Sequence, residues 1–292
     1  MTTVAGRALR REMLLDGTCV RYWEYPGHDD GAPTLLMIHG FRGDHHGLEL
    51  VVDQLPGYRV IAPDLPGFGE SEPLASGSHD IEGYTRFLHR LAGGLELGPQ
   101  TYILGHSFGS IVVSHYLAAQ PGSFRAAILV NPISEPALQG PKAIASRLAG
   151  FYYFAGAKLP ERLGLGLLRN RVIVRAMSMM MAKTRDPQLR SYIHAQHEAY
   201  FSVFANRRVV LEAFRASISA DVAGVAGQLD LPVLLIAGER DDIGSVPSQR
   251  KLAAAIPGAR LEVIPAVGHL IHYETPAPAA AYIRDFIDGM SA

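Results

Sequence analysis

Cysteine is the scarcest chemically reactive residue of this chain: its 292 residues include a single one, Cys19. One thiol excludes an intramolecular disulfide, so a reducing cytosol fits the sequence best. No histidine lies near Cys19 in the sequence, and a free cysteine usually packs as a small apolar side chain. We therefore expect Cys19 to be structural and not a nucleophile.

Long apolar runs are also missing. No run reaches the ~18–20 residues that a membrane span needs. The opening residues, MTTVAGRALRREMLLDG, contain no apolar segment typical of a secretory signal. We therefore predict a soluble, cytoplasmic protein without a membrane span.

The chain has no strong excess of either charge. Its 27 Lys and Arg and 28 Asp and Glu give a formal net charge of −1, which argues against nucleic acid as a partner. The histidines show no metal-ligand spacing such as H-E-x-x-H, so the sequence implies no metal and no cofactor. Apolar residues, by contrast, make up 48% of the chain, enough for a sizeable core. The oligomeric state stays open.

Short apolar runs alternate with amphipathic stretches along most of the chain. Asp16-Gly17 is a hairpin turn signal between two opening strands, at 10–15 and 18–25. Further strands are expected at 34–39, 58–63, 101–105, 126–132, 231–238 and 259–265, with helices at 45–55, 80–97, 108–120, 247–256 and 276–290. Strands that alternate with helices predict right-handed βαβ units. The expected fold class is therefore α/β, with a mostly parallel sheet of about eight strands flanked by helices.

The alternation stops between Pro132 and Leu231. This stretch has helical patterns and no convincing strand, and aromatic residues and methionines are concentrated in it. We interpret 133–230 as a helical lid inserted over the carboxyl edge of the sheet. The core would then consist of 1–132 and 231–292. Ordinary packing of lid helices on the core would also explain why apolar residues are concentrated in this stretch.

The segment Gly105-His106-Ser107-Phe108-Gly109 matches the pattern G-x-S-x-G. It lies where a buried strand turns into a helix, and a serine on so tight a turn needs small neighbours on either side. The helix start behind it favours a developing anion. The purely structural alternative is a tight turn in which the serine has no chemical role. We interpret Ser107 as a nucleophile.

A serine hydroxyl is a weak nucleophile and needs a base. Among twelve histidines, His269 is the best candidate, because it follows the last expected strand and precedes the last helix. His272 is an alternative, and His106 should point away from the neighbouring serine. The other histidines considered are expected on the surface or in the lid: His45, His46, His194 and His197.

The base in turn needs an acid that fixes its tautomer. Asp241 is the preferred acid, because it follows the strand that ends at Gly238, and Asp242 is the reserve. Asp64 also follows a strand, but the glycines after it suggest a structural turn. Two backbone N–H groups, those of Phe41 and Phe108, are the expected donors to an oxyanion.

Taken together, these motifs make the sequence resemble the α/β-hydrolase superfamily. The matching segments are HGF at 39–41, DLPGFGES at 64–71, GHSFGS at 105–110, GERDDI at 238–243 and GHLIHYETP at 268–276. Their order along the chain, serine then acid then histidine, is the family order. The resemblance implies a triad of Ser107, His269 and Asp241, an oxyanion hole from Phe41 and Phe108, and a lid at 133–230.

The expected activity is hydrolysis of a small-molecule carboxylic ester with a hydrophobic acyl or aryl group, through an acyl-enzyme. A carbon–carbon bond hydrolase of the meta-cleavage-product type is the alternative. Its members often carry asparagine before the serine and tryptophan after the histidine, where this chain has His106 and Leu270. The substrate of such an enzyme carries a carboxylate, and the arginines that could bind it are Arg169, Arg171, Arg175 and Arg190. An acyltransferase, or a receptor that binds a ligand without turnover, also remains open.

Overall fold

The computed structural model describes residues 4–29, 31–135 and 143–290. Eight strands form one sheet in the order β1-β2-β4-β3-β5-β6-β7-β8. Their bounds are β1 Leu9–Leu15, β2 Thr18–Tyr25, β3 Thr34–Ile38, β4 Arg59–Pro63, β5 Tyr102–His106, β6 Ala126–Val130, β7 Val233–Gly238 and β8 Arg260–Ile264. The first two strands pair antiparallel, β2 pairs antiparallel with β4, and every other pairing is parallel. The expected mostly parallel sheet is confirmed.

Alternation along the central strands divides their side chains between two cores. Leu36 and Ile38 of β3 pack into one apolar cluster, whereas Leu35 and Met37 pack into another. Helices α2 (Ile81–Gly94), α3 (Phe108–Ala119) and α9 (Val246–Ala255) cover the first face. The second face is covered by α1 (Glu49–Asp53) and α11 (Pro276–Asp288). Both faces are therefore buried, as a parallel sheet requires.

The hairpin between β1 and β2 follows from two residues. Asp16 and Gly17 both have positive φ angles, 47° and 83°, which is the backbone of the tight turn that Asp-Gly favours. The expected helix at 45–55 is wrong in detail. A 3-10 turn, η2 (His45–Leu48), comes first, and only then the short α1, because Asp44 caps the tighter turn through the N–H of His46. A further short helix, α10 (Ile271–Glu274), precedes α11.

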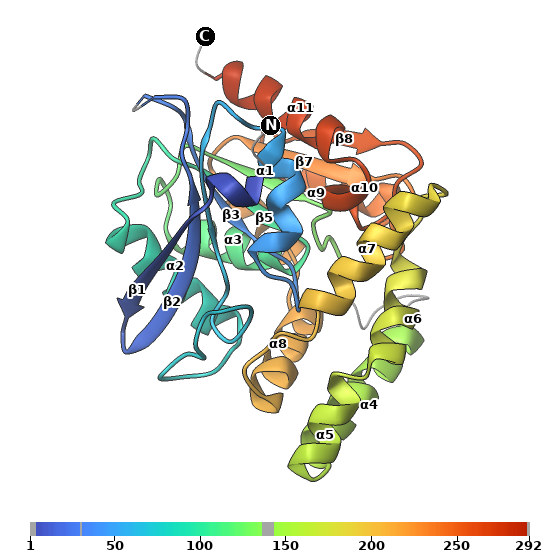
Figure 1. Ribbon diagram of the computed structural model, residues 1–292. Helices are drawn as coiled ribbons and strands as arrows, with labels where there is room; N and C mark the ends of the chain where they lie inside the picture. Colours follow the sequence, from blue (N-terminus) through green and yellow to red (C-terminus); the bar gives the residue numbers. More distant parts are fainter. Residues whose placement is uncertain (1–3, 30, 136–142, 291–292) are drawn as a thin grey trace.

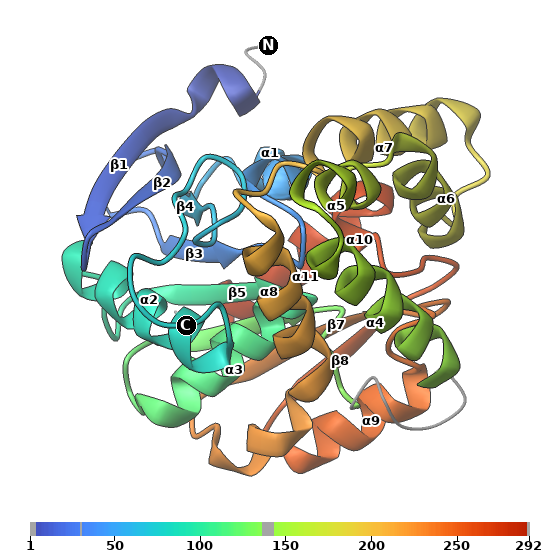
Figure 2. The ribbon, with the colours of Figure 1, turned by 90° about the horizontal axis from the view of Figure 1, so that it is seen from below.

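Between β6 and β7 the chain forms five helices among the described residues, with a 3-10 turn, η3 (Ala223–Gln228), after them. They are α4 (Ala143–Lys158), α5 (Glu161–Leu168), α6 (Arg171–Met181), α7 (Pro187–Tyr200) and α8 (Arg207–Ser219). Polar side chains at the N-caps of three of them accept backbone N–H bonds: Asn170, Asp186 and Asn206. Figures 1 and 2 show α4 to α7 on the side of the molecule away from β1.

One buried side chain connects these helices to the sheet. Arg42 follows β3 and is completely buried. Its guanidinium donates to the carbonyls of Leu168 and Phe201, at 2.8 Å each, and lies over the ring of Phe201. The helices of 143–219 therefore pack against the loop at the carboxyl end of a parallel strand.

Candidate active site

Ser107 occupies the turn between β5 and α3. Its φ and ψ angles are 53° and −117°, a conformation that is strained for a residue with a Cβ atom. The two flanking glycines are required by contact. A Cβ atom on Gly105 would lie 2.5 Å from the carbonyl oxygen of Gly109, and one on Gly109 would lie 2.3 Å from that of Ile38. The pattern of small residues thus brings β5, α3 and β3 together around the serine.

Three of the predicted side chains meet at this turn. The hydroxyl of Ser107 donates to Nε2 of His269 over 2.7 Å, and Nδ1–H of His269 donates to Oδ2 of Asp241 over 2.9 Å. His269 and Asp241 are 5% and 7% exposed. His269 comes from the loop between β8 and α10, and Asp241 from the loop after β7. The carboxyl edge of the sheet therefore brings a hydroxyl, an imidazole and a carboxylate into one continuous chain of hydrogen bonds.

The surroundings keep Asp241 ionised. Burial alone would raise the pKa of its carboxyl, but the imidazole of His269 and the N–H groups of Ile243 and Gly244 outweigh it and hold this pKa below its usual value. The neighbouring Asp242 is exposed and forms an ion pair with Lys183 instead. Of the two candidate acids, only Asp241 bonds to the imidazole.

The loop after β3 presents its backbone to the serine. A Cβ atom on Gly40 would lie 3.2 Å from the Cβ of Ser107. The carbonyl of Gly40 accepts from Nδ1–H of His39 and from the N–H of Gly43. Because a trans peptide directs its N–H opposite to its carbonyl, these bonds orient the N–H of Phe41 away from both donors. The N–H of Phe108 opens α3, where the first amides have no partner within the helix.

Two other predicted histidines lie close by with different contacts. Nε2–H of His106 donates to the backbone carbonyl of His269 over 3.3 Å, and burial lowers the pKa of His106 to about 3. Among the described hydrogen bonds, none joins the ring of His106 to the hydroxyl of Ser107. His272 is also buried, and its ring lies 4.1 Å from that of His106. Nδ1 of His272 has no hydrogen-bond partner among the residues described.

Sequence reasoning missed Asn131, which follows β6. Its side chain accepts from the N–H of Gly238 and donates to the carbonyl of Gly268, so it joins the loops that carry Asp241 and His269. Asn131 is completely buried, with φ at 44°. The only signal in the sequence was a polar residue at the end of an apolar run.

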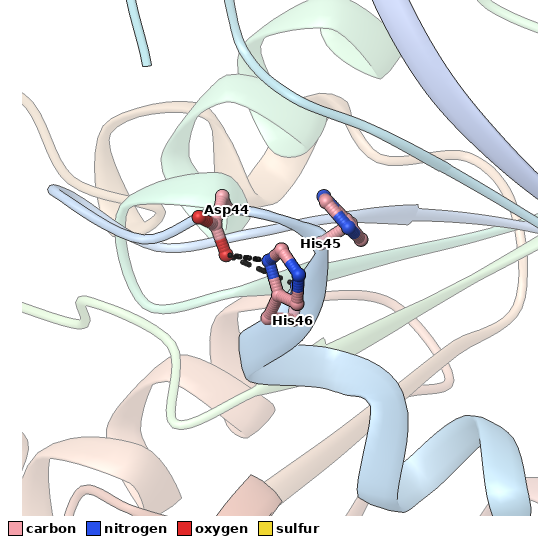
Figure 3. Close-up of side chains that lie close together, drawn as sticks. All are labelled: Asp44, His45 and His46. Atoms are coloured by element: carbon pink, nitrogen blue, oxygen red, sulfur yellow. Dashed lines mark hydrogen bonds and ion pairs between the residues drawn. The ribbon is translucent and has the colours of Figure 1, made fainter. Parts of the chain in front are cut away.

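Asp44, His45 and His46 lie together after β3 and are the one group of possible metal ligands found among the described residues (Figure 3). The expectation of a surface position for His45 is wrong: it is 2% exposed, because Trp23 stacks on its ring and Asp64 accepts from its Nδ1–H. Nδ1–H of His46 bonds to Asp44 in the same way.

The His46 ring stacks on Tyr200 of α7 and contacts the His45 ring at a tilt of 37°. Together with Trp23 these rings form a column from β2 to α7, which explains the cluster as packing. Asp64 accepts bonds from His45 and from the N–H of Glu70, so its structural interpretation agrees with the geometry.

The four arginines considered for a substrate carboxylate lie elsewhere. Arg169 donates to the carbonyl of Phe204, and Arg171 is exposed at the start of α6. Arg175 and Arg190 line an open hollow between α6 and α7. Among the described contacts, none joins these four side chains to Ser107, His269 or Asp241.

Comparisons with known proteins agree with this fold. The family described as alpha/beta hydrolase fold matches residues 33–276. Lipase 3 of Moraxella sp. (strain TA144) is 24% identical over 274 residues, which are 89% of this chain and 78% of that protein. Lipase 1 of Psychrobacter immobilis is 26% identical over 258 residues, 84% of this chain and 73% of that protein.

Among solved structures, an esterase from Exiguobacterium antarcticum superposes with a TM-score of 0.78 at 17% identity. The superposition covers 96% of this chain and 100% of the esterase. At that identity it shows a shared fold alone. No helix in the described part of this chain is long and apolar enough to span a membrane.

Proposed function

From the premise that this chain belongs to the α/β-hydrolase family, we propose that it is a serine hydrolase that cleaves carboxylic esters through an acyl-enzyme. The relatives named lipase support ester hydrolysis in general. The observation that carries the finer proposal is the continuous hydrogen-bond chain from Ser107 through His269 to Asp241.

In the proposed mechanism, His269 takes the proton of Ser107 while the oxygen attacks the ester carbonyl. Asp241 holds the imidazole in the required tautomer and stabilises its charged form. The N–H groups of Phe41 and Phe108 receive the negative charge on the carbonyl oxygen. His269 then protonates the leaving alkoxide, and water clears the acyl group by the same route.

We propose that the acyl or aryl group is hydrophobic and that 133–230 acts as the lid above it. An aromatic cluster beside the serine supports this. The ring of Phe41 packs at 5.5–6.5 Å, centre to centre, against the rings of Phe68, Phe108, Tyr153 and Phe214. Tyr153 and Phe214 belong to α4 and α8, whereas Phe41 and Phe68 lie on loops after strands and Phe108 begins α3. The proposed lid and the sheet region therefore both contribute to this aromatic cluster.

The test uses p-nitrophenyl esters graded by acyl length, with Ser107→Ala against Ser114→Ala. Ser114 lies about two helical turns further along α3, and its hydroxyl donates to the carbonyl of Ile111. We expect Ser107→Ala to lose nearly all turnover, keeping at most the ~10³–10⁴-fold over water that binding and oxyanion donors provide. Ser114→Ala should keep its activity.

A fluorophosphonate probe followed by intact mass gives a second measurement. The wild-type chain and Ser114→Ala should gain one adduct, and Ser107→Ala none. A wild-type chain that gains no adduct would contradict the nucleophile and favour a receptor. Turnover by Ser107→Ala equal to that of the wild-type chain would refute the mechanism. Product analysis in the presence of an alcohol separates hydrolysis from acyl transfer.

A further inference from the structure

The near-neutral total charge conceals an uneven distribution. Residues 143–200, which form α4 to α7, carry nine Lys and Arg against three Asp and Glu. The rest of the chain carries eighteen against twenty-five. The side of the molecule formed by these helices in Figure 1 is therefore basic and the remainder acidic. Such a separation orients a protein toward an anionic partner.

The same helices expose apolar side chains. Most of the large apolar residues that are exposed in the described structure belong to α4–α7 and the turn after α4: Leu148, Phe151, Phe154, Leu159, Leu163, Val172, Met179, Met180 and Tyr192. Single exposed apolar residues are ordinary, but a concentration of them on one basic segment indicates a binding surface.

Helix α6 shows both properties on one face. Val174, Ser178 and Ala182 are buried at four-residue spacing, and the hydroxyl of Ser178 bonds to Nδ1 of His194 and of His197 on α7. This fixes which face of α6 meets α7. The exposed side of α6 next to this buried stripe presents Val172, Arg175 and Met179, and Val172 and Met179 are 76% and 54% exposed.

Beside this face lies an open hollow of about 370 Å³ between α6 and α7, lined mainly by Arg175, Met179, Arg185, Arg190, Ser191 and His194. Arg175 forms an ion pair with Glu198. Arg185 and Arg190 have no ion-pair partner within 4 Å in the part of the chain that the structure describes. Three arginines and no carboxylate line the hollow, so its lining is positively charged. After burial, the charges of Arg175 and Arg190 also lower the pKa of His194.

We propose that this hollow binds the phosphate of an anionic phospholipid and that Val172, Met179 and Met180 enter the interfacial layer of the bilayer around it. Arginine is suited to phosphate because its planar guanidinium donates several hydrogen bonds at once. A basic surface with exposed valine and methionine fits an anionic bilayer, which offers negative headgroups above an apolar layer. Nucleic acid would engage the arginines but leave these apolar side chains in water.

The experiment is vesicle sedimentation with the full chain. We expect binding to phosphatidylcholine vesicles that contain one third phosphatidylglycerol, weakened by salt, and little binding to phosphatidylcholine alone. In Arg185→Gln/Arg190→Gln the partition coefficient should fall by about tenfold or more, because each basic residue near an anionic surface contributes about fivefold. Met179→Ser/Met180→Ser should also weaken binding. The factor lost in this variant should depend less on salt than the factor lost in the arginine variant.

The matched control is Arg250→Gln/Lys251→Gln, which removes two charges from exposed positions on α9. It should leave binding unchanged, and all variants should keep the wild-type unfolding midpoint and turnover of a water-soluble ester. Equal binding to both vesicle types, or an equal loss in the control, would overturn the proposal. Binding to duplex DNA that the arginine variant loses while vesicle binding persists would assign the surface to nucleic acid. The docking proposal stands whether or not the chain hydrolyses esters.

Discussion

At the scale of single residues, Asp241 and Asp242 follow the same strand but meet different environments. The Asp241 carboxylate is buried, accepts from the N–H of Ile243 over 2.7 Å and bonds to His269. The Asp242 carboxylate is exposed and bonds to Lys183. One position along the loop thus decides which carboxylate can hold the imidazole.

Replacing each aspartate by asparagine tests which of the two carboxylates contributes to turnover. We expect Asp241→Asn to lower kcat by about 10³–10⁴-fold, because an amide no longer stabilises the imidazolium or selects its tautomer. Asp242→Asn should keep wild-type kcat, since it loses only an exposed ion pair. Initial rates on a p-nitrophenyl ester at saturating concentration measure both. Similar losses in the two variants would remove Asp241 from its proposed role.

Sequence reasoning works at this scale where a residue type is forced by local chemistry. Ser107 is recognised because its turn requires glycines, and His269 because it follows the last strand. Asn131 and Arg42 are not recognised, because a buried asparagine or arginine on a loop has no periodicity. Their partners lie more than one hundred residues away in the sequence. The choice between Asp241 and Asp242 also depended on side-chain direction, which spacing does not determine.

At the scale of elements, Arg42 connects the loop after β3 to two helices of the proposed lid. Leu168 is the last residue of α5 and Phe201 follows α7, and their carbonyls are among those that a helix leaves without partners. A cation at that end of a helix is also favoured by its dipole. No carboxylate is needed to hold this buried charge, because the carbonyls and the ring of Phe201 surround it.

Replacing this guanidinium tests the connection. Arg42→Met should lower the free energy of unfolding by about 2–4 kcal/mol, because the carbonyl of Phe201 loses its donor and that of Leu168 keeps only the hydroxyl of Tyr152. It should also make 143–230 more accessible to protease, as measured by digestion followed by mass spectrometry. The control is Arg86→Met, which breaks an exposed pair with Glu82 on α2 and should cost less than about 1 kcal/mol. Unaltered stability and proteolysis in Arg42→Met would contradict the connection.

Strand and helix positions in the sheet region could be predicted, because the apolar period changes visibly between strand and helix. The helices of 133–230 could be expected only as a group. Their contacts with the sheet depend on the buried Arg42 and on the ring column of Trp23, His45, His46 and Tyr200, which no local pattern shows. Residues 136–142 of the expected lid lie outside the described residues.

At the scale of the whole molecule, several buried histidines are held neutral. Burial lowers the pKa values of His39, His106, His197 and His272, that of His106 to about 3 and that of His197 to about 4. In the unfolded chain an imidazole has a pKa of about 6.5. Between these values the unfolded state binds protons that the folded state does not, so acid favours unfolding.

Stability should therefore fall as the pH is lowered from about 6.5 toward 4, by up to about 1.4 kcal/mol per pH unit for each such histidine. His197→Gln removes one titrating group while leaving an amide that can bond to Ser178, so its free energy of unfolding should depend less steeply on pH in this window. His28→Gln is the control, because that ring is exposed in the folded protein. Urea unfolding at a series of pH values measures both slopes. A slope in His197→Gln equal to that of the wild-type chain would mean that His197 is protonated in the folded state, with the bond to Ser178 rearranged to accept it.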